Sequence, residues 1–131
     1  MGGMRVLLDT HVLLWWLFDD LGLSASARAL IADPGNAVLV SSASAWEIAT
    51  KRRLGKLPEA EEAVENLPRL LREARIEFMP ITVEHALAAG ALPGPHRDPF
   101  DRMLIAQSRI ENLPVVTADP VFAQYSVPVL W

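Results

Sequence analysis

Residues 96–107, HRDPFDRMLIAQ, predict the start of a helix. An aspartate followed by a proline is typical of an N-cap residue and the first helical position, and the residues after them alternate apolar and polar side chains at helical spacing. Asp98 and Asp101 therefore lie on one side of the first turn, where unpaired backbone N–H groups and the helix dipole favour negative charge. A capping box alone would explain both acids. Whether they belong to a functional site therefore depends on where the other acids of the chain lie.

Short apolar runs alternate with helical patterns along the rest of the chain. Strands are predicted at residues 5–8, 37–40, 78–81, 114–117 and 127–130. Helices are predicted at residues 11–18, 25–33, 41–53, 59–75, 83–91 and 99–112. This alternation indicates an α/β domain with a mainly parallel sheet of about five strands flanked by helices. We expect residues 1–131 to form a single domain, because no linker, internal repeat or low-complexity segment interrupts them.

The composition limits the classes of partner. The chain has 16 acidic residues against 12 lysines and arginines, a net charge of −4, so any contact with nucleic acid must be local. It has no cysteine, which excludes disulfides and thiolate metal sites, and its histidines lack zinc-like spacing. Apolar residues make up 51% of the chain, which suggests a surface used by a partner or a second copy. The apolar run at 12–18 is too short to span a membrane, and we expect a cytoplasmic protein without a signal peptide.

Three more acids follow predicted strands. Asp9 comes directly after the first strand, and Asp119 follows the fourth at nearly the same offset. Glu47 lies near the start of the helix that follows the second strand. Because ligand sites in open parallel sheets form beyond the carboxyl ends of the strands, we expect these three acids to lie at one edge of the sheet.

The helix that starts at Asp98 is harder to place, because it leads into a strand. A regular connection is expected to put its start at the opposite edge of the sheet. Two alternatives remain: either the loop at 92–97 brings the helix across, or Asp98 and Asp101 are only a cap.

Carboxylates that gather in one place repel one another. A pair about 4 Å apart costs about 1 kcal/mol in water and about 4 kcal/mol at an effective dielectric constant of 20. Proteins relieve this repulsion by protonation or with a cation. Ligation by oxygen alone suits Mg²⁺ or Mn²⁺ rather than zinc, and such a metal can activate water and neutralise charge on a phosphoryl group.

Four blocks of the chain carry a resemblance to a known family. They are LLDTHVLLW at 7–15, SSASAWEIATKRRLGKL at 41–57, HRDPFDRMLIAQ at 96–107 and LPVVTAD at 113–119. In this order and spacing they resemble the PIN domain family and, within it, the VapC-type toxins of toxin–antitoxin pairs. The resemblance implies a three-layer PIN-like fold and RNA cleavage that depends on Mg²⁺ or Mn²⁺. It also implies a homodimer inhibited by a cognate antitoxin, and a helix start that reaches the acidic pocket.

The same resemblance implies roles for the acids. Asp9, Glu47, Asp101 and Asp119 are the catalytic and metal-binding candidates. Asp9 and Asp101 would hold the metal most directly, whereas Glu47 and Asp119 would bind it through water or orient the attacking water. Asp98 is a further candidate ligand, with a helix cap as the alternative.

Hydroxyl and basic side chains near the acids are secondary candidates. Hydrogen bonds to phosphate or to the carboxylates are one possible role for three hydroxyl residues, Thr10, Ser44 and Thr117. Capping and turn formation are the alternative role. A basic cluster at the end of the helix at 41–53 either complements the helix C-terminus or contacts phosphate; it comprises Lys51, Arg52, Arg53 and Lys56.

Two other functions compete with the ribonuclease. One is a catalytically silent PIN-like module whose acids are caps and whose apolar surplus binds a protein. The other is a phosphatase with Asp9 as its nucleophile, although His11 stands where such a phosphatase needs a second acid.

Overall fold

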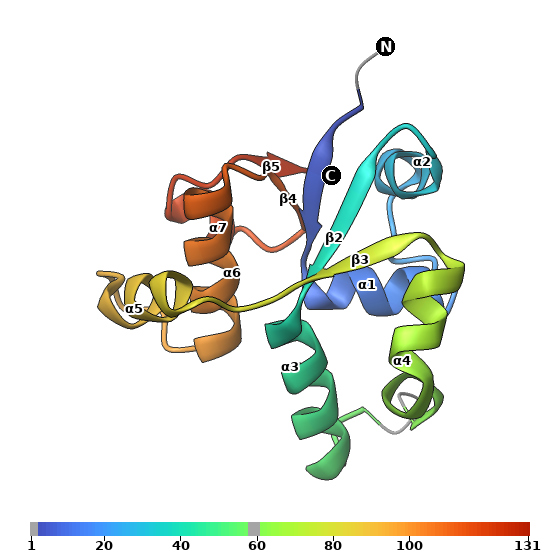
Figure 1. Cartoon of the computed structure of the whole chain (residues 1–131), viewed down its shortest axis with the longest axis horizontal. Helices are drawn as coiled ribbons and strands as arrows, with labels where there is room; N and C mark the ends of the chain where they lie inside the picture. The colour runs from blue at the N-terminus through green and yellow to red at the C-terminus, as the bar shows by residue number, and fades with distance from the viewer. Residues whose placement is uncertain (1–2, 58–60) are drawn as a thin grey trace.

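Parallel strands form one sheet in the order β3-β2-β1-β4-β5 (Figure 1). The computed structural model describes residues 3–57 and 61–131. The strands are β1 (Arg5–Leu8), β2 (Ala37–Ser41), β3 (Ile76–Met79), β4 (Val115–Val116) and β5 (Val129–Leu130). The helices are α1 (Thr10–Leu17), α2 (Ala25–Ala32), α3 (Ser42–Arg53), α4 (Glu61–Glu73), α5 (Val83–Ala91), α6 (Pro99–Glu111) and α7 (Val121–Gln124).

The sheet separates two apolar cores, because successive side chains of a strand point to opposite faces. Val6 and Leu8 of β1 pack into the core shared with α1, α2 and α4, whereas Leu7 packs into the core shared with α6 and α7. Figure 1 shows α1, α2 and α4 to one side of the strands and α5, α6 and α7 to the other. The predicted α/β fold, a parallel sheet between two layers of helices, is confirmed.

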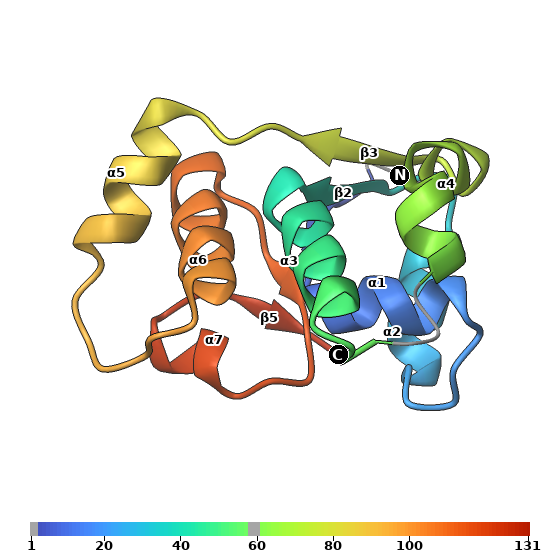
Figure 2. The same ribbon diagram turned by 90° about the horizontal axis from the view of Figure 1, so that it is seen from below.

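The carboxyl end of β1 is the topological switch point of the sheet. β2 pairs with one edge of β1 and β4 with the other, so the strand order of the sheet runs outward from β1 in both directions. α3 starts from β2 without a loop, with the Ser41 hydroxyl accepting from the Ala43 amide at 3.0 Å. Figure 2 shows α3 lying beside α6. Segments from distant parts of the sequence therefore meet at this edge.

Some predicted boundaries were wrong. The strand predicted at 78–81 is β3, which begins and ends two residues earlier; it ends at Met79, before Pro80, which has no N–H to continue the ladder with β2. The strands predicted at 114–117 and 127–130 are only two residues long as β4 and β5. The short helix α7 was not predicted, and the predicted start of a helix at residue 59 lies outside the described residues.

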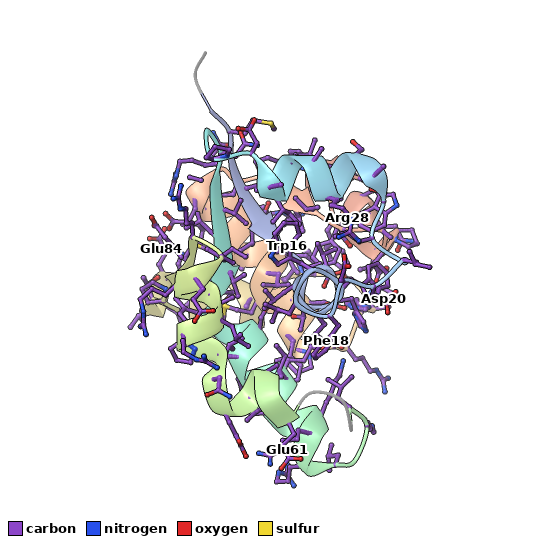
Figure 3. The ribbon with its side chains drawn as sticks, turned by 90° about the vertical axis from the view of Figure 1, so that its right-hand side faces the viewer. Trp16, Phe18, Asp20, Arg28, Glu61 and Glu84 are labelled. Atoms are coloured by element: carbon purple, nitrogen blue, oxygen red, sulfur yellow. The ribbon has the colours of Figure 1, made fainter. Side chains whose placement is uncertain are left out.

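The loop after α1 is held to α2 by one arginine. Arg28 donates to the Asp20 carbonyl oxygen at 3.1 Å and pairs with the Asp19 carboxylate at 2.6 Å (Figure 3). None of the helices in the described ranges is long and apolar enough to be a membrane span.

Candidate functional site

Asp9 lies at the switch point, directly after β1. It is the N-cap residue of α1, yet its carboxylate accepts from Thr117 Oγ1 at 2.8 Å rather than from the first turn of the helix. The side chain is buried, with the residue only 5% exposed. Burial raises the pKa of Asp9, and the charges of Glu47 and Asp119 add to this, although the Thr117 hydrogen bond and the charge of His11 act against it. The fold therefore holds this carboxylate where ionisation is costly.

Glu47 projects from α3 into the same edge and is 2% exposed. Its Oε2 accepts from Lys51 Nζ at 2.5 Å, one helical turn later. Its other oxygen, Oε1, is buried and has no hydrogen-bond partner among the described residues. An unsatisfied buried carboxylate oxygen is costly to a fold, so it points to a ligand-binding role.

Lys51 directs its ammonium group toward the acids rather than toward the end of its own helix. Burial alone would lower the pKa of Lys51, but the hydrogen bond and charge of Glu47 outweigh it and raise that pKa. The charges of Asp98 and Asp101 act in the same direction. This side chain therefore belongs to the electrostatics of the candidate site.

Arg52, the next residue, faces elsewhere. It pairs with Glu61 at 3.1 Å and with Glu65 at 3.7 Å, both on α4. Glu61 lies at the outer end of that helix (Figure 3). The basic cluster predicted at the end of α3 is therefore divided between two surfaces.

Asp101 lies in the first turn of α6, with its Oδ2 2.9 Å from His96 Nε2. Its pKa is raised to about 6. Burial is the largest cause, and the charges of Asp98, Asp9 and Glu47 add to it, while the His96 hydrogen bond opposes it. These interactions place the start of α6 beside Asp9 and Glu47.

The expectation that a regular connection would put this helix start at the opposite edge was wrong. A helix that joins two parallel strands runs antiparallel to them, so it begins at the carboxyl edge of the sheet. Here α5 comes after β3 first, and the loop at 92–98 then returns the chain to that edge before α6 begins. Asp98 and Asp101 therefore lie at the same edge as Asp9.

Arg102 holds this loop against α6. Its guanidinium donates to the carbonyl oxygens of Ala89 at 3.2 Å and His96 at 3.0 Å, and also to that of Leu92. Three backbone groups around the end of α5 and the loop are thus fixed by one side chain. Because His96 is among them, Arg102 also positions the imidazole that contacts Asp101.

Asp98 and Asp119 are partly engaged by the backbone. Asp98 Oδ1 accepts from the amides of Phe100 at 2.9 Å and Asp101 at 3.1 Å, which confirms the predicted N-cap. Asp119 Oδ1 accepts from the Val121 amide at 3.0 Å. Capping and turn formation therefore account for one oxygen of each residue.

The three hydroxyl candidates hold the site together. Thr10 Oγ1 lies 2.8 Å from Ser44 Oγ in the buried contact between α1 and α3. Thr117 donates to Asp9 and accepts from the Asp119 amide at 2.9 Å. Thr117 is thus a direct neighbour of two of the acids, whereas Thr10 and Ser44 join α1, which Asp9 precedes, to α3, which carries Glu47.

The acids at this edge form a donor set of oxygen atoms. Carboxylate oxygens without sulfur are the ligands of Mg²⁺ and Mn²⁺, and the unpartnered Glu47 Oε1 has that chemistry. In the described ranges, however, no three acidic, histidine or cysteine side chains surround a common point, and Asp9, Glu47 and Asp101 each bond to a separate neighbour. A cavity of about 260 Å³ is lined in part by Asp9, His11 and Asp119. The donors fit such an ion, and their neighbours must move for several to share it.

Two side chains contact the acids in a way that was not predicted from the sequence, although Lys51 was named there as part of the basic cluster. Lys51 had a signal, since glutamate and lysine four residues apart on a helix are neighbours. His96 had none, because its contact with Asp101 depends on how the loop folds back on α6.

Asp101 gives the metal-free protein a measurable pH dependence. Its pKa is about 6 in the folded chain against an ordinary value of 3.8, so the folded state binds this proton more tightly. The resulting stabilisation is complete below about pH 4 and is lost as the pH rises through about 6. We expect the melting temperature of Asp101→Asn to exceed that of the unchanged protein by a margin that grows from pH 4.5 to pH 7.5. Thermal unfolding in chelator checks this, with Asp33→Asn at an exposed position as control; a constant margin would contradict it.

Comparison with known proteins gave one family and a set of similar structures. The model of the PIN domain family matches residues 6–128. Ribonuclease VapC16 of Mycobacterium tuberculosis is 45% identical over 62 residues, which cover 47% of this chain and 43% of that protein. The match thus spans less than half the length of this curated relative.

The similar structures agree over nearly the whole chain. VapBC2 from Rickettsia felis, bound to a DNA fragment from its promoter, has a TM-score of 0.66 at 17% identity and covers 97% of this chain and 98% of its own. FitAcB from Neisseria gonorrhoeae has a TM-score of 0.63 at 20% identity and covers 96% of both chains. The PIN domain endonuclease Utp24 has a TM-score of 0.55 at 14% identity, covering 99% of this chain and 86% of its own. At these identities the likeness establishes the fold alone.

Proposed function

Since this chain belongs to the PIN domain family, we propose that it is a divalent-metal-dependent endoribonuclease and the toxin of a toxin–antitoxin pair. The partial match to a ribonuclease supports the reaction class. We further propose that residues 1–131 act as one domain in the cytoplasm.

The observation that carries this proposal is electrostatic. Asp9, Glu47 and Asp101 come from separate segments, and the charge of each acts on at least one of the others at the switch point of the sheet. The family's fold supplies the scaffold, but these side chains are the reason to assign hydrolysis. Acids that served only as caps would bond to backbone amides, as Asp98 and Asp119 do with one oxygen each.

We assign the metal to Asp9 and Asp101, with Glu47, Asp119 and Asp98 as further candidate ligands. A bound Mg²⁺ or Mn²⁺ would supply a lowered pKa for water and neutralise charge on the scissile phosphate. Thr117 orients the Asp9 carboxylate, and His96 orients that of Asp101. Both contacts reduce the rotational freedom that these ligands would otherwise lose on binding.

Glu47 and Asp119 are assigned to the attacking water. Glu47 Oε1 has no hydrogen-bond partner among the described residues, so it would be free to accept from that water and orient it for in-line attack on the phosphorus. The Asp119 amide donates to Thr117 Oγ1, and Asp119 lines the cavity beside Asp9, from which water or substrate can enter.

We infer a protein partner from the chemistry of this edge. One of the similar solved structures, which covers 96% of both chains at 19% identity with a TM-score of 0.58, is a toxin–antitoxin complex from Klebsiella pneumoniae. A cluster of carboxylates attracts a cationic side chain, so a cognate antitoxin that inserts lysine or arginine there would block RNA and metal together.

A homodimer is proposed from exposed apolar side chains. Val83 and Leu87 lie one turn apart on α5 and are 77% and 70% exposed, and Trp46 on α3 is 60% exposed. Neighbouring exposed apolar residues on a helix face are typical of an interface. Sedimentation equilibrium tests this proposal, and a monomer mass at micromolar concentration would contradict it.

The direct test is RNA cleavage by the purified protein. We expect cleavage with Mg²⁺ or Mn²⁺ and a loss of at least about a hundredfold in chelator, because the cation supplies several kcal/mol of charge stabilisation. Restoring the metal must restore the activity. Cleavage that persists in chelator would contradict the assignment.

A silent binding module is the second candidate, favoured by the capping bonds of Asp98 and Asp119. It predicts no cleavage and no rise in melting temperature with Mn²⁺, since a protein without the site gains no stability from the ion. The phosphatase alternative instead predicts a trapped phosphoaspartate at Asp9.

A further inference from the structure

Glu47 is a buried carboxylate, and Lys51 is the cation that pairs with it among the described residues. Lys51 Nζ is 2.5 Å from Glu47 Oε2, and the two residues lie one turn apart on α3, with Lys51 in the last turn of the helix. The Glu47 side chain is 3% exposed and that of Lys51 is 27% exposed, so one partner is buried and the other reaches it from the surface. The charges of Asp98 and Asp101 also act on this ammonium group.

We propose that Lys51 is a tethered counter-ion that neutralises Glu47 in the metal-free protein and must leave Oε2 before Glu47 can bind a divalent cation through both of its oxygens. The inference rests on the proposed function in that Glu47 is taken as part of the metal site. It assigns Lys51 as a positioning residue that sets how tightly the metal binds.

The geometry gives a reason for such a residue. A buried carboxylate left unpaired costs several kcal/mol, so the metal-free fold needs a cation at Glu47. A lysine suits this role because its single charge is carried on a flexible four-carbon stem that can leave without disturbing the backbone. A divalent cation carries twice that charge, so it competes for the same oxygen and releases the ammonium group.

Competition of this kind has a sign that calorimetry can read. Because the metal must displace Lys51, removing the ammonium group should tighten metal binding rather than weaken it. We expect Lys51→Met to bind Mn²⁺ on the order of tenfold more tightly than the unchanged protein, as isothermal titration calorimetry measures without RNA. The metal-free Lys51→Met protein should also melt at a lower temperature, and Mn²⁺ should raise its melting temperature by more.

Arg52→Met is the matched control. It removes one positive charge from the next position of the same helix, but its partners Glu61 and Glu65 lie on α4. Its affinity for Mn²⁺ should stay within about twofold of the unchanged protein, as expected for a distant surface charge screened by salt. Lys51→Gln serves if Lys51→Met does not fold, since glutamine removes the charge but still donates to Glu47.

A double-mutant cycle tests the pair without any metal. If Lys51 acts through Glu47, then Lys51→Met should change the metal-free melting temperature far less in a Glu47→Gln background. Equal effects in both backgrounds would overturn the pairing.

Affinity for Mn²⁺ that is unchanged or weaker in both Lys51 variants would overturn the proposal. If the unchanged protein cleaves RNA with Mn²⁺ while the Lys51 variants bind Mn²⁺ no more tightly, only the proposed role of Lys51 is overturned. If no form of the protein binds Mn²⁺, the counter-ion proposal is overturned and the metal-dependent function fails with it.

Discussion

Replacing Asp9 with asparagine is expected to lower the rate of RNA cleavage by about 10³-fold or more while leaving the fold intact. Asparagine has nearly the same shape, and its side-chain oxygen can still accept from Thr117. It lacks the negative charge that a cation and its bound water require. Losing a charge that acts at the reacting centre costs about 4 kcal/mol of transition-state stabilisation, which is three factors of ten.

The same substitution should not destabilise the metal-free protein. Burial raises the pKa of Asp9, so the folded chain bears a cost for keeping this carboxylate ionised, and asparagine removes that cost. We expect a melting temperature equal to or above that of the unchanged protein in chelator. Single-turnover cleavage and thermal unfolding together separate lost chemistry from lost structure. An Asp9→Asn protein that keeps a tenth of the activity would exclude Asp9 from the reaction.

The second large effect is expected at Arg102, which fixes the loop before α6. Arg102→Met keeps much of the apolar stem but removes charge-assisted hydrogen bonds to the carbonyl oxygens of Ala89, Leu92 and His96. Hydrogen bonds to a charged donor are worth about 1.5–3 kcal/mol each. Because the freed carbonyl oxygens can partly compensate by bonding to water, we expect a loss of roughly 2–4 kcal/mol in the free energy of unfolding. Urea unfolding measures this loss.

Arg109→Met on the same helix is the control for Arg102. Arg109 donates to the Tyr125 carbonyl oxygen at an exposed position, so its removal should cost less than about 1 kcal/mol. Because Arg102 also positions His96, its variant should lose cleavage activity even where it is fully folded. Equal stabilities for the two variants would show that the loop is held by other contacts.

Local patterns were enough to predict the helix starts and the layers. The aspartate before Pro99 caps α6 as predicted, because a short side chain reaches the amides two and three residues ahead whatever the rest of the chain does. Successive side chains of β1 likewise point into opposite cores: Val6 and Leu8 pack into one, and Leu7 packs into the other. The family resemblance is confirmed by the match over residues 6–128.

Strand ends were predicted less well, since pairing decides them. β4 and β5 keep only the residues that find ladder partners, and β3 is displaced toward the register that β2 imposes. The catalytic and metal-binding roles of Asp9, Glu47, Asp98, Asp101 and Asp119 stay predictions, which the experiments above test.

The sequence by itself determined the α/β alternation, the capped start of α6 and the order in which acids follow strands, because these depend on residues a few positions apart. Only the tertiary structure decided what each acid touches. Lys51 pairs with Glu47, Thr117 holds Asp9 from 108 residues away, and His96 reaches Asp101 through a folded-back loop. Those contacts depend on where distant segments cross at the switch point, and spacing along the chain does not specify where they cross.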